Sequence, residues 1–135
     1  MSAPDYGRSL TGLSLNLIVR DIEQALAFQR DVLGATVVYS DADFAVLRGC
    51  DSEWMLHADH TYLDHPMTGL LADSAGRGAG AELRLHGCDP DRAEAAARLL
   101  GFTVLAPAAD KPHGLREAYL LDQDGYVWVA DVHKK

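Results

Sequence analysis

The sequence has little cysteine, no cluster of basic residues and no long apolar run. Its two cysteines, Cys50 and Cys88, are far apart in the chain and do not form a pair with metal-binding spacing, so we expect reduced thiols. No apolar run approaches the length of a transmembrane helix, and the first ten residues are too polar for a signal peptide. These absences favour a cytoplasmic protein.

The charge balance argues against two classes of partner. The chain has 12 Lys and Arg against 20 Asp and Glu, and its formal net charge is −8 at pH 7. A protein that binds the phosphate backbone of nucleic acid needs clustered Lys and Arg. An acidic membrane surface would repel this chain as well. We therefore expect neither nucleic acid nor membrane among its partners.

One sequence pattern occurs twice, at residues 13–40 and again at 81–106. In each copy a short alternating run is followed by an acidic residue, an amphipathic segment, a glycine and a β-rich run. The acidic residue is a good helix N-cap and the glycine a good helix end, and these four positions are Asp21, Gly34, Asp89 and Gly101. Two copies in a chain of this length predict two similar modules that share one core.

The remaining segments complete the plan of each module. Further strands are expected at 36–39, 44–48 and 53–58, and in the second copy at 103–106, 117–121 and 126–132. Asp124-Gly125 carries a hairpin signal between the last two. We expect one domain over 1–135, with a flexible lead-in at 1–12, module one at 13–58, a linker at 59–80 with a helical turn around 67–72, and module two at 81–133.

The order β-α-β-β-β, found twice, resembles the vicinal oxygen chelate superfamily, the glyoxalase, bleomycin-resistance and extradiol-dioxygenase group. The resemblance rests on three segments, which are Leu17–Asp21, Ala27–Gly34 shortly after it, and Leu121–Tyr126. Gln29 stands where the family usually has Tyr, and Gln123 where it usually has Pro. The resemblance implies an α+β fold in which two βαβββ modules form a curled mixed sheet around a cleft.

The metal-dependent members of that family place ligands on the first and last strands of each module. Carried onto this chain, three of these positions are Ser14, Glu82 and Val129. Serine is a poor ligand and valine cannot be one, whereas a divalent ion needs three or more converging N or O ligands. We expect no metal or other cofactor, and keep as the alternative a divalent ion in a shifted site that uses Glu82 with His57 and His86.

Three histidines near the end of module one look like a metal cluster at first sight. His57 ends a strand, whereas His60 and His65 fall in the linker, and none has helical metal spacing. We expect solvated or loop-capping roles for them.

Candidate ligand-binding residues are taken from strand faces and from one loop. Glu82, Arg84 and His86 project from one face of a strand, where Arg84 suits a carboxylate or phosphate. The alternative is a surface ion pair between Glu82 and Arg84. The loop before the penultimate strand borders the cleft in this family. The full candidate set is Asn16, Trp54, Glu82, Arg84, His86, His113, Arg116, Tyr119 and Val129.

Two aromatic candidates keep alternative roles. Trp54 can stack on a flat ligand, or pack in the core or at a dimer interface. Tyr119 can donate a hydrogen bond, act as an acid with help from Arg84, or simply pack. Neither cysteine has the surroundings of a nucleophile, and no Ser-His-Asp, phosphate-loop or dinucleotide motif is present.

The function we infer from this pattern is metal-independent binding of an aromatic or amphipathic metabolite or drug in a cleft. One alternative is a lyase, isomerase or dioxygenase with a rearranged metal site, or a metal-free enzyme with Glu82 as base and Arg84 as oxyanion partner. A structural or regulatory domain is a third possibility. Because relatives often complete their clefts across a two-fold interface, we expect a homodimer, with modules paired within one chain or swapped across the dimer.

Overall fold

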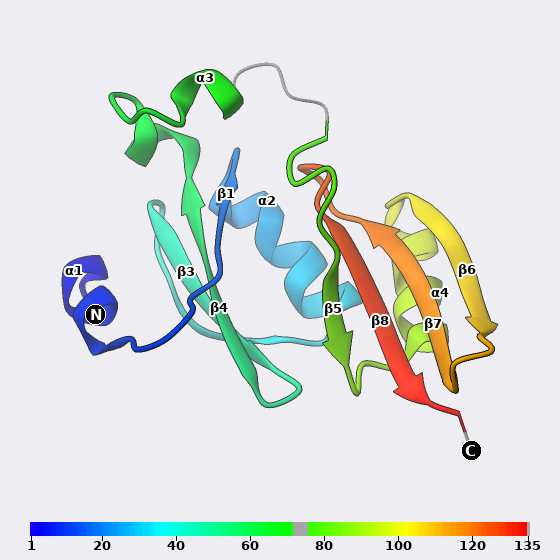
Figure 1. Ribbon diagram of the computed structural model, residues 1–135. Helices are drawn as coiled ribbons and strands as arrows, with labels where there is room; N and C mark the ends of the chain where they lie inside the picture. The colour runs from blue at the N-terminus through cyan, green and yellow to red at the C-terminus, as the bar shows by residue number, and fades with distance from the viewer. Residues whose placement is uncertain (72–75, 135) are drawn as a thin grey trace.

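The computed structural model describes residues 1–71 and 76–134, and these form two four-stranded sheets with the same topology (Figure 1). Sheet one has the order β1-β4-β3-β2 and sheet two the order β5-β8-β7-β6. In each sheet the first strand pairs parallel with the last, and the other pairs are antiparallel. The strands are β1 (Asn16–Val19), β2 (Thr36–Ser40), β3 (Phe44–Gly49), β4 (Ser52–Ala58), β5 (Leu83–His86), β6 (Val104–Asp110), β7 (Leu115–Leu121) and β8 (Val127–His133). The predicted α+β fold is confirmed.

One helix connects the first two strands of each sheet and follows the sequence signals for its ends. In sheet one α2 (Ile22–Ala27) continues into a π-helical turn, η1 (Phe28–Val32), and in sheet two α4 (Pro90–Leu100) takes the equivalent place. The Asp21 carboxylate accepts a hydrogen bond from a backbone N–H of the first turn, and so does that of Asp89. Gly34 and Gly101 have φ values of +74° and +83°, which is the left-handed conformation that a glycine C-cap supplies.

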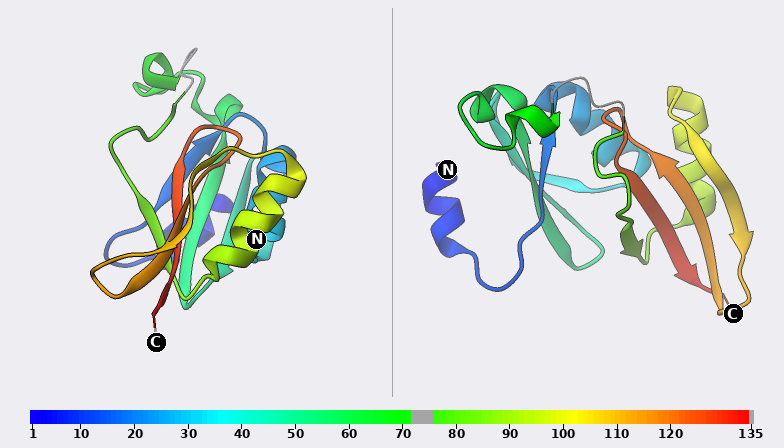
Figure 2. Two further views of the ribbon diagram at one scale, coloured as in Figure 1. Left: turned by 90° about the vertical axis from the view of Figure 1, so that its right-hand side faces the viewer. Right: turned by 45° about the horizontal axis from the view of Figure 1, so that its top comes forward.

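The two helices and the inner faces of both sheets share one hydrophobic core. Figure 2 shows both helices on the same side of the strands. Aromatic rings join the modules: the Phe28 ring centroid lies 5.0 Å from that of Phe102, and the Trp54 and Trp128 centroids lie 5.5 Å apart. The opposite, outer faces of the sheets carry polar side chains together with buried apolar ones, such as Ile18 and Val129. Among the described residues no helix is long and apolar enough to cross a membrane.

The N-terminal segment differs from the expected flexible lead-in, because Ala3–Ser9 forms a helix, α1. Ser2 caps it, and the Tyr6 hydroxyl donates a hydrogen bond to Glu53 Oε2 at 2.6 Å. Local capping and one tertiary contact thus order a segment whose composition alone is typical of a loop. The alternation of apolar and polar residues at 13–19 predicts a strand over that whole range, but β1 begins only at Asn16 and Leu13 is fully exposed.

The amphipathic pattern of the second module's helix predicts that Ala93, Ala96, Ala97 and Leu100 face inward, and the structure differs at Leu100. Ala93 and Ala97 are buried, but Leu100 is 46% exposed because it lies in the last turn, beside the glycine cap. Its side chain therefore extends past the edge of the core.

The linker contains a 3-10 turn, η2 (Asp59–Tyr62), and a short helix, α3 (Thr68–Leu71), which confirms the expected helical turn as far as residue 71; residue 72 lies outside the described residues. Arg77 is buried and connects the linker to both modules. Its guanidinium donates to the Asp59 carboxylate at 2.6 and 2.8 Å and to the Ile18 carbonyl at 3.1 Å, and it lies 4.0 Å from Asp124 in the β7–β8 turn. Charge-assisted hydrogen bonds thus join Arg77 to Asp59 at the start of the linker.

Candidate functional site

A cavity of about 310 Å³ lies where the first residues of β4, β5 and β8 meet, and we call it the seam cavity. Its apolar lining consists of Leu13, Leu15, Trp54, Leu83, Leu85 and Trp128. Its polar lining consists of Ser52, Glu53, Glu82 and Arg84. An apolar wall with a few polar groups, at a volume near the lower end for small-molecule sites, is the usual composition of a ligand pocket.

The Arg84 guanidinium lies among three carboxylates on the outer face of sheet two. Nη1 donates to Glu82 Oε1 at 2.9 Å, and Nη2 forms an ion pair with Glu117 and lies 3.3 Å from Asp131 Oδ2. The side chains of Glu117 and Asp131 are only 5% and 1% exposed. The Tyr119 hydroxyl lies 3.3 Å from Nη1 and completes what we call the Arg84 cluster.

Hydrogen bonding controls the ionisation of this cluster. Burial lowers the pKa of the Arg84 guanidinium, but hydrogen bonds to Tyr119, Glu82 and Glu117 outweigh it and raise that pKa overall. Hydrogen bonds from Tyr119 and Arg84 lower the pKa of Glu82. Both partners therefore stay charged at neutral pH.

Two histidines extend the cluster toward solvent. His86 Nδ1 lies 2.8 Å from Asp131 Oδ1, and His113 Nε2 lies 3.6 Å from Glu117 Oε2. Each buried carboxylate is thus shared between Arg84 and one exposed histidine. With both histidines neutral, three carboxylates oppose one guanidinium, so the cluster carries an excess of negative charge.

The outer face of sheet one carries a different, uncharged group. Asn16 Nδ2 donates to the Tyr62 hydroxyl at 2.9 Å, and Asn16 Oδ1 lies 2.7 Å from His57 Nδ1, which must donate to that carbonyl oxygen. The His57 ring stacks on Phe44 with centroids 5.5 Å apart. Burial lowers the pKa of His57 below its usual range, so its imidazole is neutral at pH 7.

The structure brings most of the candidate residues of module two together. Glu82, Arg84, His86, Tyr119 and His113 all belong to the Arg84 cluster or contact it. Val129 pairs in register with both Arg84 and Tyr119 and is fully buried.

The other three candidates lie elsewhere. Asn16 is on sheet one. Trp54 lines the seam cavity but is largely buried, and its Nε1 donates to Gln29 Oε1 at 2.9 Å. Arg116 donates to the Asp91 carboxylate of α4 at 2.8 Å, so its guanidinium faces the helix and not the cluster.

Sequence reasoning missed the two buried carboxylates, Glu117 and Asp131. The sequence does indicate that these two side chains lie on the same strand faces as the candidate residues, because residues two positions apart in a strand point to the same face. Glu117 has the parity of Tyr119, and Asp131 has the parity of Val129, both of which are in the candidate set. What the sequence did not signal is their burial, since acidic residues are rarely buried without a partner.

The donor set of this face does not fit a divalent metal ion of the usual type. Within residues 1–71 and 76–134, no three His, Cys, Asp or Glu side chains are grouped so that they could hold an ion. Glu82, Glu117 and Asp131 are all turned toward the Arg84 guanidinium, whose positive charge would oppose a metal ion.

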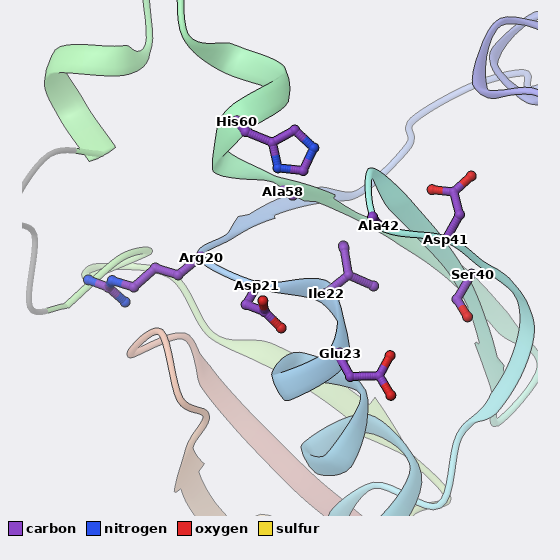
Figure 3. Close-up of a pocket in the computed structure, with 9 residues that line it drawn as sticks. All are labelled: Arg20, Asp21, Ile22, Glu23, Ser40, Asp41, Ala42, Ala58 and His60. Atoms are coloured by element: carbon purple, nitrogen blue, oxygen red, sulfur yellow. The ribbon is translucent and has the colours of Figure 1, made fainter.

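A second cavity, of about 350 Å³, lies beside the start of α2, and Figure 3 shows the side chains that surround it. They come from the β1–α2 junction, from the end of β2 and the turn after it, and from the end of β4 and η2, and they are Arg20, Asp21, Ile22, Glu23, Ser40, Asp41, Ala42, Ala58 and His60. None of the candidate residues lies there. Two of its polar groups have structural partners, since Asp21 caps α2 and His60 Nε2 contacts Asp43 at 2.6 Å. The seam cavity is therefore the better candidate site.

Comparison with known proteins places this architecture in one class: the chain has the fold of glyoxalase, bleomycin-resistance and dioxygenase proteins. One similar structure is a glyoxalase/bleomycin resistance protein/dioxygenase family enzyme from Burkholderia phytofirmans PsJN, with TM-score 0.72 and 19% identity over 89% of this chain and 96% of that one. Another, a glyoxalase/bleomycin resistance protein/dioxygenase from Nocardioides, has TM-score 0.65 and 22% identity over 98% and 93%. The fosfomycin resistance protein FosX from Listeria monocytogenes has TM-score 0.66 and 17% identity over 93% and 95%. No family model and no curated protein matches the sequence. The resemblance found in the sequence is thus confirmed at the level of the fold.

Proposed function

We propose that the protein is a metal-independent small-molecule binding protein, which holds an aromatic or amphipathic metabolite or drug in the seam cavity. The observation that carries this proposal is the composition of the cavity, where Trp54, Trp128 and four leucines provide apolar wall and Glu82 and Arg84 provide polar contacts. Burial of apolar ligand surface supplies affinity, and a few fixed polar groups orient the ligand.

Metal independence is supported by the way Arg84 is bound. A guanidinium held by several carboxylates takes the place that a metal ion would need among the same oxygens. The carboxylates are therefore satisfied without a metal.

The experiment is a ligand screen by thermal unfolding, run in parallel with and without a chelator. The panel consists of aromatic metabolites and antibiotics, and a ligand at a hundredfold over its dissociation constant should add about 2.7 kcal/mol to the unfolding free energy. We expect stabilisation that the chelator does not change. Stabilisation that disappears in chelator and returns with Zn, Mn, Fe(II), Ni or Co would contradict metal independence and favour a lyase, isomerase or dioxygenase.

One observation favours a metal-free enzyme as the second candidate. The low pKa of Glu82 makes it a weak base, whereas the exposed His86 ring is held through Nδ1 by the buried Asp131 and presents Nε2 to solvent. In this second candidate function, His86 Nε2 accepts a proton from a bound substrate, and the buried Asp131 holds the ring in place through Nδ1. Substrate turnover by the chelated protein that His86→Gln abolishes would support it, and turnover unchanged by that variant would contradict it.

We also propose a homodimer in the cytoplasm. Leu13 and Leu15 are exposed at the rim of the seam cavity, where a second copy would cover them. Light scattering at micromolar concentration tests the proposed dimer, and a strictly monomeric species would count against it.

The proposed location in the cytoplasm is supported by the free thiols of Cys50 and Cys88, which agree with a reducing compartment.

A further inference from the structure

The polar part of the seam cavity is acidic, and this determines the charge of the ligand that it can accept. Two carboxylates, Glu53 from β4 and Glu82 beside β5, line the cavity together with a single cation, Arg84. They come from different modules, so the cavity has negative charge contributed by both sheets.

Arg84 contributes little positive charge to the cavity, because its guanidinium is already shared among Glu82, Glu117 and Asp131. An anionic ligand at this position would add a fourth negative group around one guanidinium. It would have to displace internal carboxylates, two of which are almost fully buried and would lose their charge partner. The expected match of Arg84 to a carboxylate or phosphate is therefore disfavoured by its surroundings.

The two carboxylates that line the cavity can each accept a further hydrogen bond. Glu53 accepts one hydrogen bond at each oxygen, from the Tyr6 hydroxyl and from Arg48 Nη2, and Glu82 accepts hydrogen bonds from Arg84 Nη1 and from Tyr119. An ionised carboxylate has about four lone-pair sites, so both side chains can accept from an ammonium group as well. Their side chains are 31% and 47% exposed, which leaves them accessible from the cavity.

We propose that the ligand of the seam cavity is a cationic amphiphile, an amine or amidine attached to an aromatic or aliphatic body. The body lies against Trp54, Trp128 and the cavity leucines, and the cationic group lies between Glu53 and Glu82. The net charge of −8 attracts such a ligand from solution as well. This inference rests on the proposed function, since it specifies the ligand class for the same cavity.

The test uses three probes of nearly equal shape that differ in charge: 4-phenylbutylamine, 4-phenylbutanol and 4-phenylbutyrate. Both tryptophans of the chain line the cavity, so their fluorescence reports binding at this site. We expect the amine to bind about tenfold more tightly than the alcohol, and the carboxylate to bind most weakly. Binding of the carboxylate as tightly as the amine overturns the cationic ligand class but leaves a binding cavity. Absence of binding by all three overturns the proposed function together with it.

A pair of variants separates the cavity from the overall charge of the protein. Glu82→Gln removes one negative charge from the cavity, and Asp31→Asn removes one from an exposed position of η1. Glu82→Gln should reduce the affinity for the amine about tenfold and leave that for the alcohol unchanged, whereas Asp31→Asn should leave both unchanged. Equal losses in the two variants would show a general charge effect and would overturn the assignment to the cavity. Circular dichroism of both variants confirms that the fold is retained.

Discussion

The two sheets have one topology but different chemistry on their outer faces. Sheet one carries a neutral chain of hydrogen bonds through His57, Asn16 and Tyr62, whereas sheet two carries the charged Arg84 cluster with buried Glu117 and Asp131. The inner faces are alike, because both pack on a helix in the shared core. The repeated fold thus depends on the inner faces, which are alike, whereas the two outer faces differ in their charge.

The largest effect is expected when the charged face loses its cation. Arg84→Met removes the guanidinium that the buried Glu117 and Asp131 share and leaves each of them with only an exposed histidine as partner, which should lower the unfolding free energy by about 3–5 kcal/mol. Denaturant unfolding of the variant measures this. Adding Glu117→Gln to Arg84→Met should recover part of the loss, because it removes one of the unpaired charges. A loss below about 1 kcal/mol would show that the cluster is solvated like a surface ion pair.

The β7–β8 turn of the second module contains a buried carboxyl group, which should make stability depend on pH. In the β7–β8 turn burial raises the pKa of Asp122 to about 6, although its carboxylate accepts hydrogen bonds from the Asp124 and Tyr126 amides and from Trp128 Nε1. A carboxyl with a raised folded-state pKa contributes stability below its unfolded pKa near 3.8, and this is lost as pH rises through about 6. The contribution is roughly 3 kcal/mol for two pKa units.

Unfolding free energies measured between pH 4 and pH 7.5 test this, with Asp122→Asn as the reference that does not titrate. The stability of the unmodified protein relative to Asp122→Asn should fall as pH rises across that window. A difference that does not vary with pH would mean that Asp122 is ionised in the folded protein throughout.

The neutral face should be less sensitive than the charged one. Asn16→Ala removes the group that joins His57 to Tyr62, and leaves two polar partners unpaired in a half-buried position. We expect the unfolding free energy to fall by about 1–2 kcal/mol, because no buried charged group loses its partner. If this loss equalled that of Arg84→Met, the distinction between the two faces would fail.

The smallest effect is expected in the β3–β4 turn, the counterpart of the turn that contains Asp122. Cys50 and Asp51 both have positive φ, at 49° and 62°, and they connect paired residues Gly49 and Ser52. Asn-Gly is the preferred sequence for a two-residue turn of this kind. The double substitution Cys50→Asn and Asp51→Gly should therefore raise the unfolding free energy by about 1 kcal/mol, seen as a higher melting temperature. A lower melting temperature would indicate that Cys50 makes a stabilising contact there.

Much of the fold can be predicted from local sequence signals. Periodicity changes and the caps at Asp21, Gly34, Asp89 and Gly101 predict the positions of both helices, because these signals act within a few residues of the chain. The α1 helix is the main exception. It is ordered in part by the contact of Tyr6 with Glu53, which lies 47 residues away in the sequence.

Some features of the candidate site can likewise be predicted from the sequence, and others cannot. Composition alone gives the acidic character of the chain, and changes of periodicity give the repeated βαβββ plan. A period of two also places Glu82, Arg84 and His86 on one face of β5. Only the tertiary structure decided that Arg84 is neutralised by Glu117 and Asp131 and that Arg116 is turned toward α4, because these contacts join different elements of the chain. It also decided where β4, β5 and β8 meet, and thus that an acidic seam cavity exists.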